Sequence, residues 1–334
     1  MTPIDFPGAG TPAVLEVRGL GVRIHVGGQE LRAVDDVSFD LAPGETLGLV
    51  GESGSGKTMT ALALMRLGET PPIEIDRGTV RLAGQDLLAL PERAMEDVRG
   101  RALSMVFQEP MTALNPVLTV GRQVAEPLRR HLRLSRGAAR ARMVALLDQV
   151  GLPAPEQIAR SYPHELSGGM RQRVTIAIAI ACRPAVLVAD EPTTALDVTV
   201  QAQILDLLRA LQTEMGMAML LITHDLGVIA EVADRVAVMY AGRVVETAPV
   251  AALFRAPAHP YTRGLLRSVP RIERTRPTSL PEIAGMVPSL LALPPGCAFA
   301  ARCGRATARC EAERPGLAPF GAGHDVACWW PGDD

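Results

Sequence analysis

The residues best suited to chemistry in this sequence of 334 residues form one short run, Gly51-Glu52-Ser53-Gly54-Ser55-Gly56-Lys57-Thr58. The run matches G-x-x-x-x-G-K-[ST], a pattern whose glycines let backbone N–H groups close around phosphate oxygens. Its lysine reaches the terminal phosphates, and the hydroxyl of its last residue binds Mg²⁺. We therefore predict a nucleotide-phosphate site with Mg²⁺ at Thr58. Its binding residues are Gly51, Ser53, Gly54, Ser55, Gly56, Lys57 and Thr58.

A buried strand and a helix must flank this run if it is to hold a phosphate. Thr46–Val50 before it has the composition of a short buried strand, and Met59–Met65 after it indicates a helix. The start of that helix would add its positive dipole end to the site. The alternative, a glycine-rich turn with an incidental lysine, is disfavoured by this flanking pattern.

A second candidate site is the acidic pair Asp190-Glu191. It directly follows Ala185–Ala189, whose apolar composition predicts a strand of a buried parallel sheet. At the end of such a strand Asp190 could hold Mg²⁺, and Glu191 could orient or deprotonate an attacking water. The alternative is a pair of acidic residues that simply ends a strand.

A third feature is Leu166-Ser167-Gly168-Gly169-Met170-Arg171-Gln172. Ser167 is a good N-cap for a helix that runs to about Ala181, and Gly168 and Gly169 expose backbone N–H groups at its start. We predict a second anion site there. A plainly capped helix without a ligand is the alternative.

Hydrophobic periodicity predicts an α/β protein. Helices dominate from about residue 92 to 161, and Ala138–Val150 forms an amphipathic helix with Met143, Leu146, Leu147 and Val150 on one face. Further strands are expected at 15–17, 37–41 and 219–223, and a hairpin at 236–240 and 243–246.

Composition excludes several classes of function. The net charge is −2 and aromatic residues make up 3%, which argues against nucleic acid as a partner. No apolar run approaches the roughly 18–20 residues that span a bilayer. Residues 1–5 lack the features of a secretory signal, so we expect a cytosolic chain.

The composition changes after about residue 255. Eleven of the 27 prolines lie in residues 256–334, so we expect a loop-rich appendage rather than a regular sheet or helix bundle. Four cysteines lie there with the spacing C-x₅-C-x₆-C-x₁₇-C, namely Cys297, Cys303, Cys310 and Cys328. In a reducing compartment this clustering favours a four-thiolate metal site over disulfides. The fifth, Cys182, is expected in the core.

Together these features closely resemble the nucleotide-binding subunit of ATP-binding cassette (ABC) transporters. Gly51–Thr58 resembles the Walker A loop, and 186–191 resembles the Walker B strand with the catalytic glutamate. Leu166–Gly169 resembles the LSGGQ signature, with Met170 where Gln is usual. The Q-loop, D-loop and switch motifs have counterparts in Phe107-Gln108-Glu109-Pro110, Ala195-Leu196-Asp197 and Thr223-His224-Asp225.

The resemblance implies a fold and a mechanism. The fold is a P-loop NTPase core with a helical subdomain. Two cassettes would enclose two ATP molecules, each held by Walker A of one chain and by Ser167, Gly168 and Gly169 of the other. Thr58, Gln108 and Asp190 would hold Mg²⁺, and Asp197 would lie beside the nucleotide. Glu191 would polarise water, His224 would contact the γ-phosphate, and Gln108 would relay closure to a membrane subunit.

One departure from the family concerns adenine. The family places an aromatic residue in the first strand, where this chain has Gly21-Val22-Arg23-Ile24-His25. We expect Ile24 or His25 to pack on adenine instead.

The tail resembles that of dipeptide and oligopeptide importer ATPases. The resemblance lies in Ala258–Thr262, in Pro295-Gly296-Cys297-x-Phe299, and in the cysteines that follow. It implies a [4Fe–4S] cluster on Cys297, Cys303, Cys310 and Cys328. Zinc or free thiols are the alternative.

We therefore expect an ABC-type nucleotide-binding domain over 1–255, with its helical subdomain at about 92–180, and an irregular cysteine-containing extension over 256–334. The chain would hydrolyse ATP to drive a peptide importer, as a peripheral protein on the cytoplasmic face of the inner membrane. Its partners would be two permeases, a second ATPase (a heterodimer is favoured) and, indirectly, an extracytoplasmic peptide-binding protein. The alternatives are a soluble ABC ATPase acting on nucleic acid or ribosomes, and an importer of nickel, glutathione or sugar.

Overall fold

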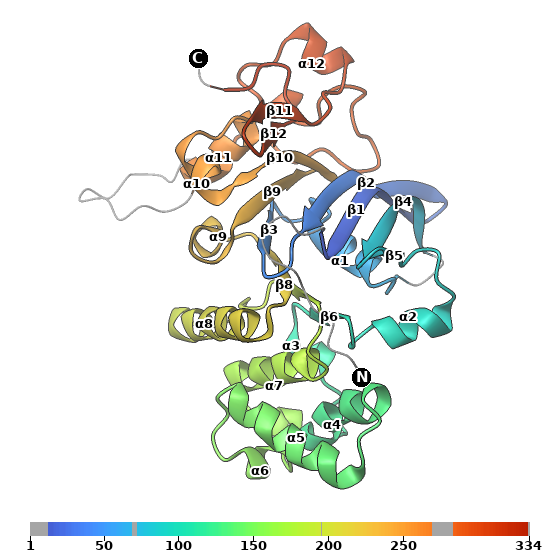
Figure 1. Cartoon of the computed structure of the whole chain (residues 1–334). Helices are drawn as coiled ribbons and strands as arrows, with labels where there is room; N and C mark the ends of the chain where they lie inside the picture. The colour runs from blue at the N-terminus through green and yellow to red at the C-terminus, as the bar shows by residue number, and fades with distance from the viewer. Residues whose placement is uncertain (1–12, 69–71, 195, 269–282, 333–334) are drawn as a thin grey trace, which may run out of the picture. The chain divides into compact units, whose positions relative to one another are not determined.

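The structure is a computed structural model that describes residues 13–68, 72–194, 196–268 and 283–332 (Figure 1). The described chain divides into two compact units. The first comprises 13–15, 41–45 and 82–222, and the second comprises 16–40, 46–81 and 223–332. No helix within the described ranges is long and apolar enough to cross a membrane.

The first unit combines a parallel sheet with a group of helices. Strand β7 (Val186–Asp190) pairs in parallel with β6 (Leu103–Val106) and with β8 (Ala218–Thr223), and all five of its residues are buried. The unit also holds β5 (Gln85–Asp86), α2 (Glu92–Val98), α3 (Pro110–Ala113), α4 (Val120–His131), α5 (Arg136–Gln149), α6 (Pro155–Ile158), η1 (Pro163–Glu165), α7 (Gly168–Ile180) and α8 (Val198–Met215).

The predicted elements of this unit are confirmed. Helix α5 buries Met143, Leu146 and Leu147 on one face, and Val150 caps its end and is buried too. Ser135 caps its start by accepting a hydrogen bond from the Ala138 N–H. Helices α4 to α7 gather in one group (Figure 1).

The second unit contains two sheets. The antiparallel one orders β2 (Gln29–Leu41), β1 (Leu15–Val26) and β4 (Ile73–Leu82) side by side. In the other, β3 (Thr46–Val50) pairs in parallel with β9 (Arg235–Tyr240), which continues antiparallel into β10 (Arg243–Pro249). The predicted hairpin is thus confirmed. The helices are α1 (Lys57–Leu64), α9 (Leu226–Val232), α10 (Val250–Arg255), α11 (Pro260–Ser268), η2 (Ala300–Arg302) and α12 (Ala308–Ala312).

The extension departs from the expected irregular structure. Strand β12 (His324–Val326) pairs with β10, and β11 (Ala318–Gly321) pairs with β12, so the tail adds two strands to the sheet. The prediction of no regular sheet after residue 255 was therefore wrong. Proline content misled it, because Pro319 lies on an edge strand, where a missing N–H costs little.

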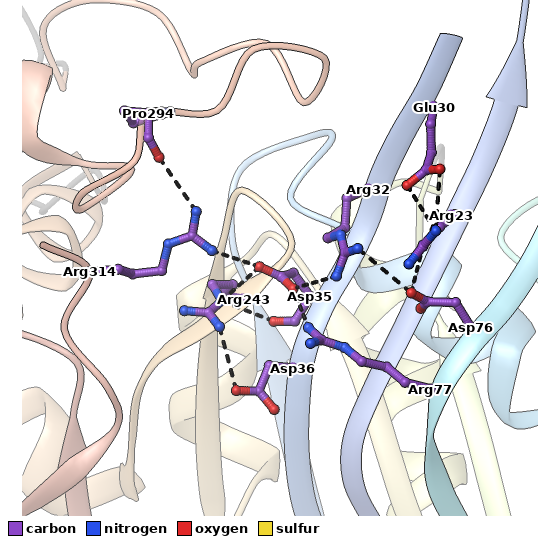
Figure 2. A network of polar contacts seen from close by, with 10 residues as sticks. All are labelled: Arg23, Glu30, Arg32, Asp35, Asp36, Asp76, Arg77, Arg243, Pro294 and Arg314. Carbon is purple, nitrogen blue, oxygen red and sulfur yellow. Dashed lines mark hydrogen bonds and ion pairs between the residues drawn. The ribbon is translucent and has the colours of Figure 1, made fainter. Parts of the chain in front are cut away.

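One carboxylate in β2 ties several parts of this unit together (Figure 2). Asp35 is 6% exposed and forms ion pairs with Arg32 (3.2 Å), Arg243 (3.1 Å) and Arg314 of the extension (2.8 Å), and also with Arg77 of β4. Burial raises the pKa of Asp35, but the arginines, Arg243 foremost, outweigh it and hold the pKa below its usual value.

Candidate functional site

The phosphate loop links β3 to α1, as the sequence predicted. Gly51 has φ 157°, and a Cβ there would lie 2.2 Å from the Met239 carbonyl oxygen, so only glycine fits. Lys57 is 6% exposed, and its Nζ donates to the carbonyl oxygens of Gly51 (2.8 Å) and Glu52 (3.0 Å). The loop is thus closed around its own lysine.

The other residues of the loop divide between its inside and its rim. Ser55 is 2% exposed and lies inside. Ser53, Gly54 and Thr58 are exposed to solvent, and Gly56 is half-buried. The rim therefore presents two hydroxyl groups and backbone N–H groups at the start of a helix, the groups that bind phosphate and Mg²⁺.

The acidic pair lies at the end of β7. Asp190 is 1% exposed, whereas Glu191 has φ 45°, a left-handed conformation that is strained for a residue with a side chain. Its backbone N–H donates to the Ile222 carbonyl oxygen (2.9 Å). Its carboxylate accepts hydrogen bonds from Gln108 Nε2 (3.1 Å) and Thr194 Oγ1 (2.7 Å). The structure thus brings two predicted site residues, Gln108 and Glu191, together.

The third predicted site lies at the start of α7. Ser167 caps this helix by accepting a hydrogen bond from the Met170 N–H (3.3 Å), and both Ser167 and Gly168 are exposed. A Cβ at Gly169 would lie 2.8 Å from Val200 Cγ1, so a larger residue would push α7 away from α8. The start of α7 is therefore capped and open to solvent, and backbone N–H groups at such a helix start can bind an anion.

The remaining predicted residues occupy separate places. Asp197 caps α8 by accepting from the Val200 N–H (3.0 Å), and Ala195 beside it lies outside the described residues. His224 is exposed between β8 and α9. His25 pairs with Glu74 (3.2 Å). The predicted contact of His25 or Ile24 with adenine stays a prediction. The phosphate loop and His224 belong to one unit, and Gln108, Ser167, Asp190 and Glu191 to the other.

Comparison with known proteins decides the family. A family profile described as "ABC transporter" matches residues 34–194, and one described as "Oligopeptide/dipeptide transporter, C-terminal region" matches 245–310. A "Putative peptide import ATP-binding protein" of Brucella ovis is 53% identical over 325 residues, which cover 94% of this chain and 96% of the relative. The chain belongs to the ABC transporter family.

Two further relatives extend the comparison. The "Oligopeptide transport ATP-binding protein" of Bacillus subtilis is 48% identical and matches 95% of this ABC chain and 88% of its own length. A solved structure titled "Dimeric structure of a post-hydrolysis state of the ATP-binding cassette MJ0796 bound to ADP and Pi" is 28% identical. It superposes with a TM-score of 0.64 over 71% of this chain and 98% of its own. The expected fold class, a P-loop ABC cassette, is confirmed.

In this ABC chain a buried carboxylate organises the start of the extension. Glu246 is fully buried and accepts hydrogen bonds from the backbone N–H groups of Ala258 (2.7 Å) and His259 (2.9 Å), and it pairs with His324 (2.7 Å). The Nδ1 of His259 accepts from the Tyr261 N–H (3.0 Å), and burial lowers the pKa of His259 to about 3. The neutral imidazole thus fixes the turn that carries Tyr261.

The four cysteines of the extension line one small cavity. Phe299, Trp329 and Trp330 complete its apolar wall. Among the residues that the structure describes, no three His, Cys, Asp or Glu side chains come close enough together to bind one metal ion. The four predicted cysteines therefore lie around one cavity, and metal binding by them stays a prediction.

Cys182 does not belong to this group. It is half-buried, its thiol donates to the Pro127 carbonyl oxygen (3.6 Å), and burial raises its pKa to about 11. Cys182 was predicted to lie in the core, whereas the structure leaves it half-buried beside a backbone carbonyl, so that prediction was wrong.

Sequence reasoning missed three residues that touch the sites. Thr194 binds the Glu191 carboxylate, and Tyr261 and Arg302 of the extension contact Glu52 of the phosphate loop. A Thr three residues after the glutamate is a local signal that could have been noticed. The other two lie more than 200 residues from Glu52, and no sequence pattern joins them.

Proposed function

We propose that this chain hydrolyses ATP to drive the import of peptides through a membrane. The observation that carries the proposal is that an ABC cassette and an oligopeptide-type extension occur in one chain, with relatives named for peptide import matching nearly its full length. The residues 1–255 would form the cassette, with a helical subdomain at about 92–180, and 256–334 the extension.

In this proposal two cassettes bind ATP between them, by analogy with the solved ATP-binding cassette, which is a dimer bound to ADP and Pi. Lys57 and the loop N–H groups hold the phosphates, and Thr58, Gln108 and Asp190 hold Mg²⁺. Ser167, Gly168 and Gly169 of the second chain bind the γ-phosphate at the start of α7. Asp197 lies beside the nucleotide.

Glu191 is the proposed general base, with His224 at the γ-phosphate. The Glu191 carboxylate accepts hydrogen bonds from Gln108 and Thr194, so it is oriented before water arrives. Because Gln108 contacts both Glu191 and, in this proposal, Mg²⁺, a shift of its loop would report the nucleotide state to the permease.

The cysteine cavity is proposed to hold a [4Fe–4S] cluster. The proposal is supported by the four cysteines that line one cavity and by the match of the tail to the oligopeptide/dipeptide transporter C-terminal region. Four thiolates can ligate such a cluster, and a zinc ion bound by the same cysteines is the competing proposal. The cluster would cross-link the loops of the extension.

Membership of the ABC transporter family also supports a proposal about partners. We propose a position on the cytoplasmic face of the inner membrane, with two permeases, a second ATPase in a heterodimer, and an extracytoplasmic peptide-binding protein that supplies cargo. Nickel, glutathione or sugar importers and a soluble ABC ATPase on nucleic acid or ribosomes are the competing functions.

Affinity purification from detergent-solubilised membranes, followed by mass spectrometry, tests the proposal. Two multi-span permeases and a second ATPase are expected with the chain. Recovery only with ribosomes or nucleic-acid proteins would contradict it. Binding of peptides, rather than nickel, glutathione or sugars, by the co-purified system's binding protein would then identify the cargo class.

A further inference from the structure

One residue of the phosphate loop is held from outside the nucleotide motifs. The Glu52 N–H donates to the Tyr261 hydroxyl (2.8 Å), and the Glu52 carbonyl oxygen accepts from Lys57 Nζ (3.0 Å). The Glu52 carboxylate accepts two hydrogen bonds from Arg302, to Oε2 (2.7 Å) and Oε1 (3.0 Å). Two of these three attachments come from the extension.

Arg302 is itself held in a single position. Its side chain is 5% exposed. Its Nε donates to the Ala284 carbonyl oxygen (3.0 Å), Nη2 to that of Ile283 (3.0 Å), and Nη1 to the Tyr240 hydroxyl (3.3 Å). The hydrogen bonds to Glu52 raise the pKa of Arg302 further, so its charge is permanent. A rigid, paired arginine holds a carboxylate bidentately with little loss of side-chain entropy.

The same residues connect the phosphate loop to the cysteine cavity. Arg302 ends η2 and directly precedes Cys303. Phe299, which lines the cavity, packs its ring on Tyr240 (5.3 Å between centroids) and Tyr261 (5.5 Å). Tyr240 and Tyr261 are both fully buried. Folding of the segment that carries Phe299 and Cys303 therefore positions Arg302 and Tyr261, the two residues of the extension that bind Glu52.

The charge of Glu52 makes this contact matter for ATP. An unpaired carboxylate in a loop that binds a triphosphate would repel the ligand. Pairing with Arg302 neutralises it, and fixing the loop before ATP arrives reduces the ordering cost of binding.

We propose that Arg302, through Glu52, is a positioning residue that raises the affinity of the phosphate loop for ATP. The extension thereby tunes nucleotide binding in its own chain. This inference rests on the proposed function only in taking Gly51–Thr58 as the ATP site. The distance of Arg302 from the motifs explains why no nucleotide motif includes it.

A double-mutant cycle tests the proposal. Equilibrium ATP binding is measured on the full chain, carrying Glu191→Gln to prevent turnover, with Arg302→Gln, Glu52→Gln and both together. Arg302→Gln should weaken ATP binding about tenfold, within the range typical of coupled sites. Glu52→Gln should cost less, because it removes the repulsive charge along with the contact. The double variant should recover most of the affinity lost in Arg302→Gln.

Two additional variants serve as controls, one for the charge of Arg302 and one for the loss of any arginine ion pair. Arg302→Lys keeps the charge without the bidentate geometry and should recover part of the affinity. Arg130→Gln breaks an exposed ion pair with Glu96 and should leave binding unchanged. Wild-type affinity in Arg302→Gln, or a double variant no better than Arg302→Gln, would overturn the inference. If the parent chain bound no ATP at all, the proposed function would fail with it.

Discussion

The phosphate loop and the cysteine cavity are built in opposite ways. The loop is eight consecutive residues whose glycine positions and flanking strand and helix are all local, down to the φ of 157° at Gly51. The cavity gathers Cys310 from the short helix α12 and Cys297, Cys303 and Cys328 from irregular segments on either side of it. A motif of consecutive residues can therefore be recognised from its spacing alone. A site whose residues are brought together by folding depends on tertiary contacts that the spacing does not show. The ion pair between Arg302 and Glu52 shows that the phosphate loop is also held by the segment next to the cysteine cavity.

The largest effect is expected at the chemical step. Glu191→Gln removes the proposed base but keeps the shape and the hydrogen-bonding position of the side chain. ATP turnover should fall more than about 100-fold, as expected when a general base is lost, while ATP binding persists. Steady-state hydrolysis and equilibrium binding measure the two separately. Glu96→Gln, at an exposed pair, is the control and should hydrolyse normally. Wild-type turnover in Glu191→Gln would remove this residue from the mechanism.

The second prediction concerns the cysteine cavity. Cys303→Ser should abolish iron binding, because a cluster needs all four thiolates. Cys182→Ser, at the cysteine outside the cavity, should keep full iron content. Elemental analysis, and electron paramagnetic resonance after chemical reduction of the anaerobically purified chains, provide the measurement. Zinc in place of iron, or equal metal in both variants, would contradict the proposed cluster.

The third prediction concerns the arginine cluster around Asp35. Asp35→Asn leaves several arginines without their carboxylate and should destabilise the second unit by about 2–3 kcal/mol. This is below the cost of breaking a fully buried pair, because the arginines are partly solvated. Asp36→Asn, at a side chain 56% exposed, should cost less than about 0.5 kcal/mol. Denaturant unfolding of both variants gives the values, and equal costs would refute the role of Asp35.

The same carboxylate predicts a dependence of stability on acid. The pKa of Asp35 in the folded chain lies below its usual value of 3.8. Its contribution is therefore fully present above the unfolded pKa and is lost as the pH falls through the folded pKa. In Asp35→Asn, the free energy of unfolding should depend less on pH at and below about pH 3.8 than in the unchanged chain. An unchanged profile would show that other carboxylates control acid unfolding.

The smallest effect is expected where two helices meet at the signature. Gly169→Ala adds a Cβ 2.8 Å from Val200 Cγ1 and should cost about 1–2 kcal/mol through overpacking. Gly137→Ala, on α5, adds a Cβ into open space and should stabilise its helix slightly. Thermal unfolding distinguishes the two changes. A neutral Gly169→Ala would mean that α7 and α8 adjust freely.

The sequence predicted what short-range chemistry determines. The strand before Gly51, the cap at Ser167 and the strand before Asp190 were all found, because each depends on neighbours in the chain. It missed β11 and β12, whose pairing with β10 is a tertiary contact that overrides the proline content. It missed the partners of Glu52 for the same reason, since Tyr261 and Arg302 reach the loop only in the folded chain.

One measurement tests the link between the two regions directly: the ATP affinity of the full chain before and after chelation of the proposed cysteine-bound metal, with Glu191→Gln in both samples. Loss of the metal should loosen the loop that carries Arg302. We predict weaker ATP binding in the depleted chain, by about the factor found for Arg302→Gln, and no further loss when Arg302→Gln itself is depleted. Equal ATP affinity with and without the metal would contradict the claim that the extension tunes the phosphate loop.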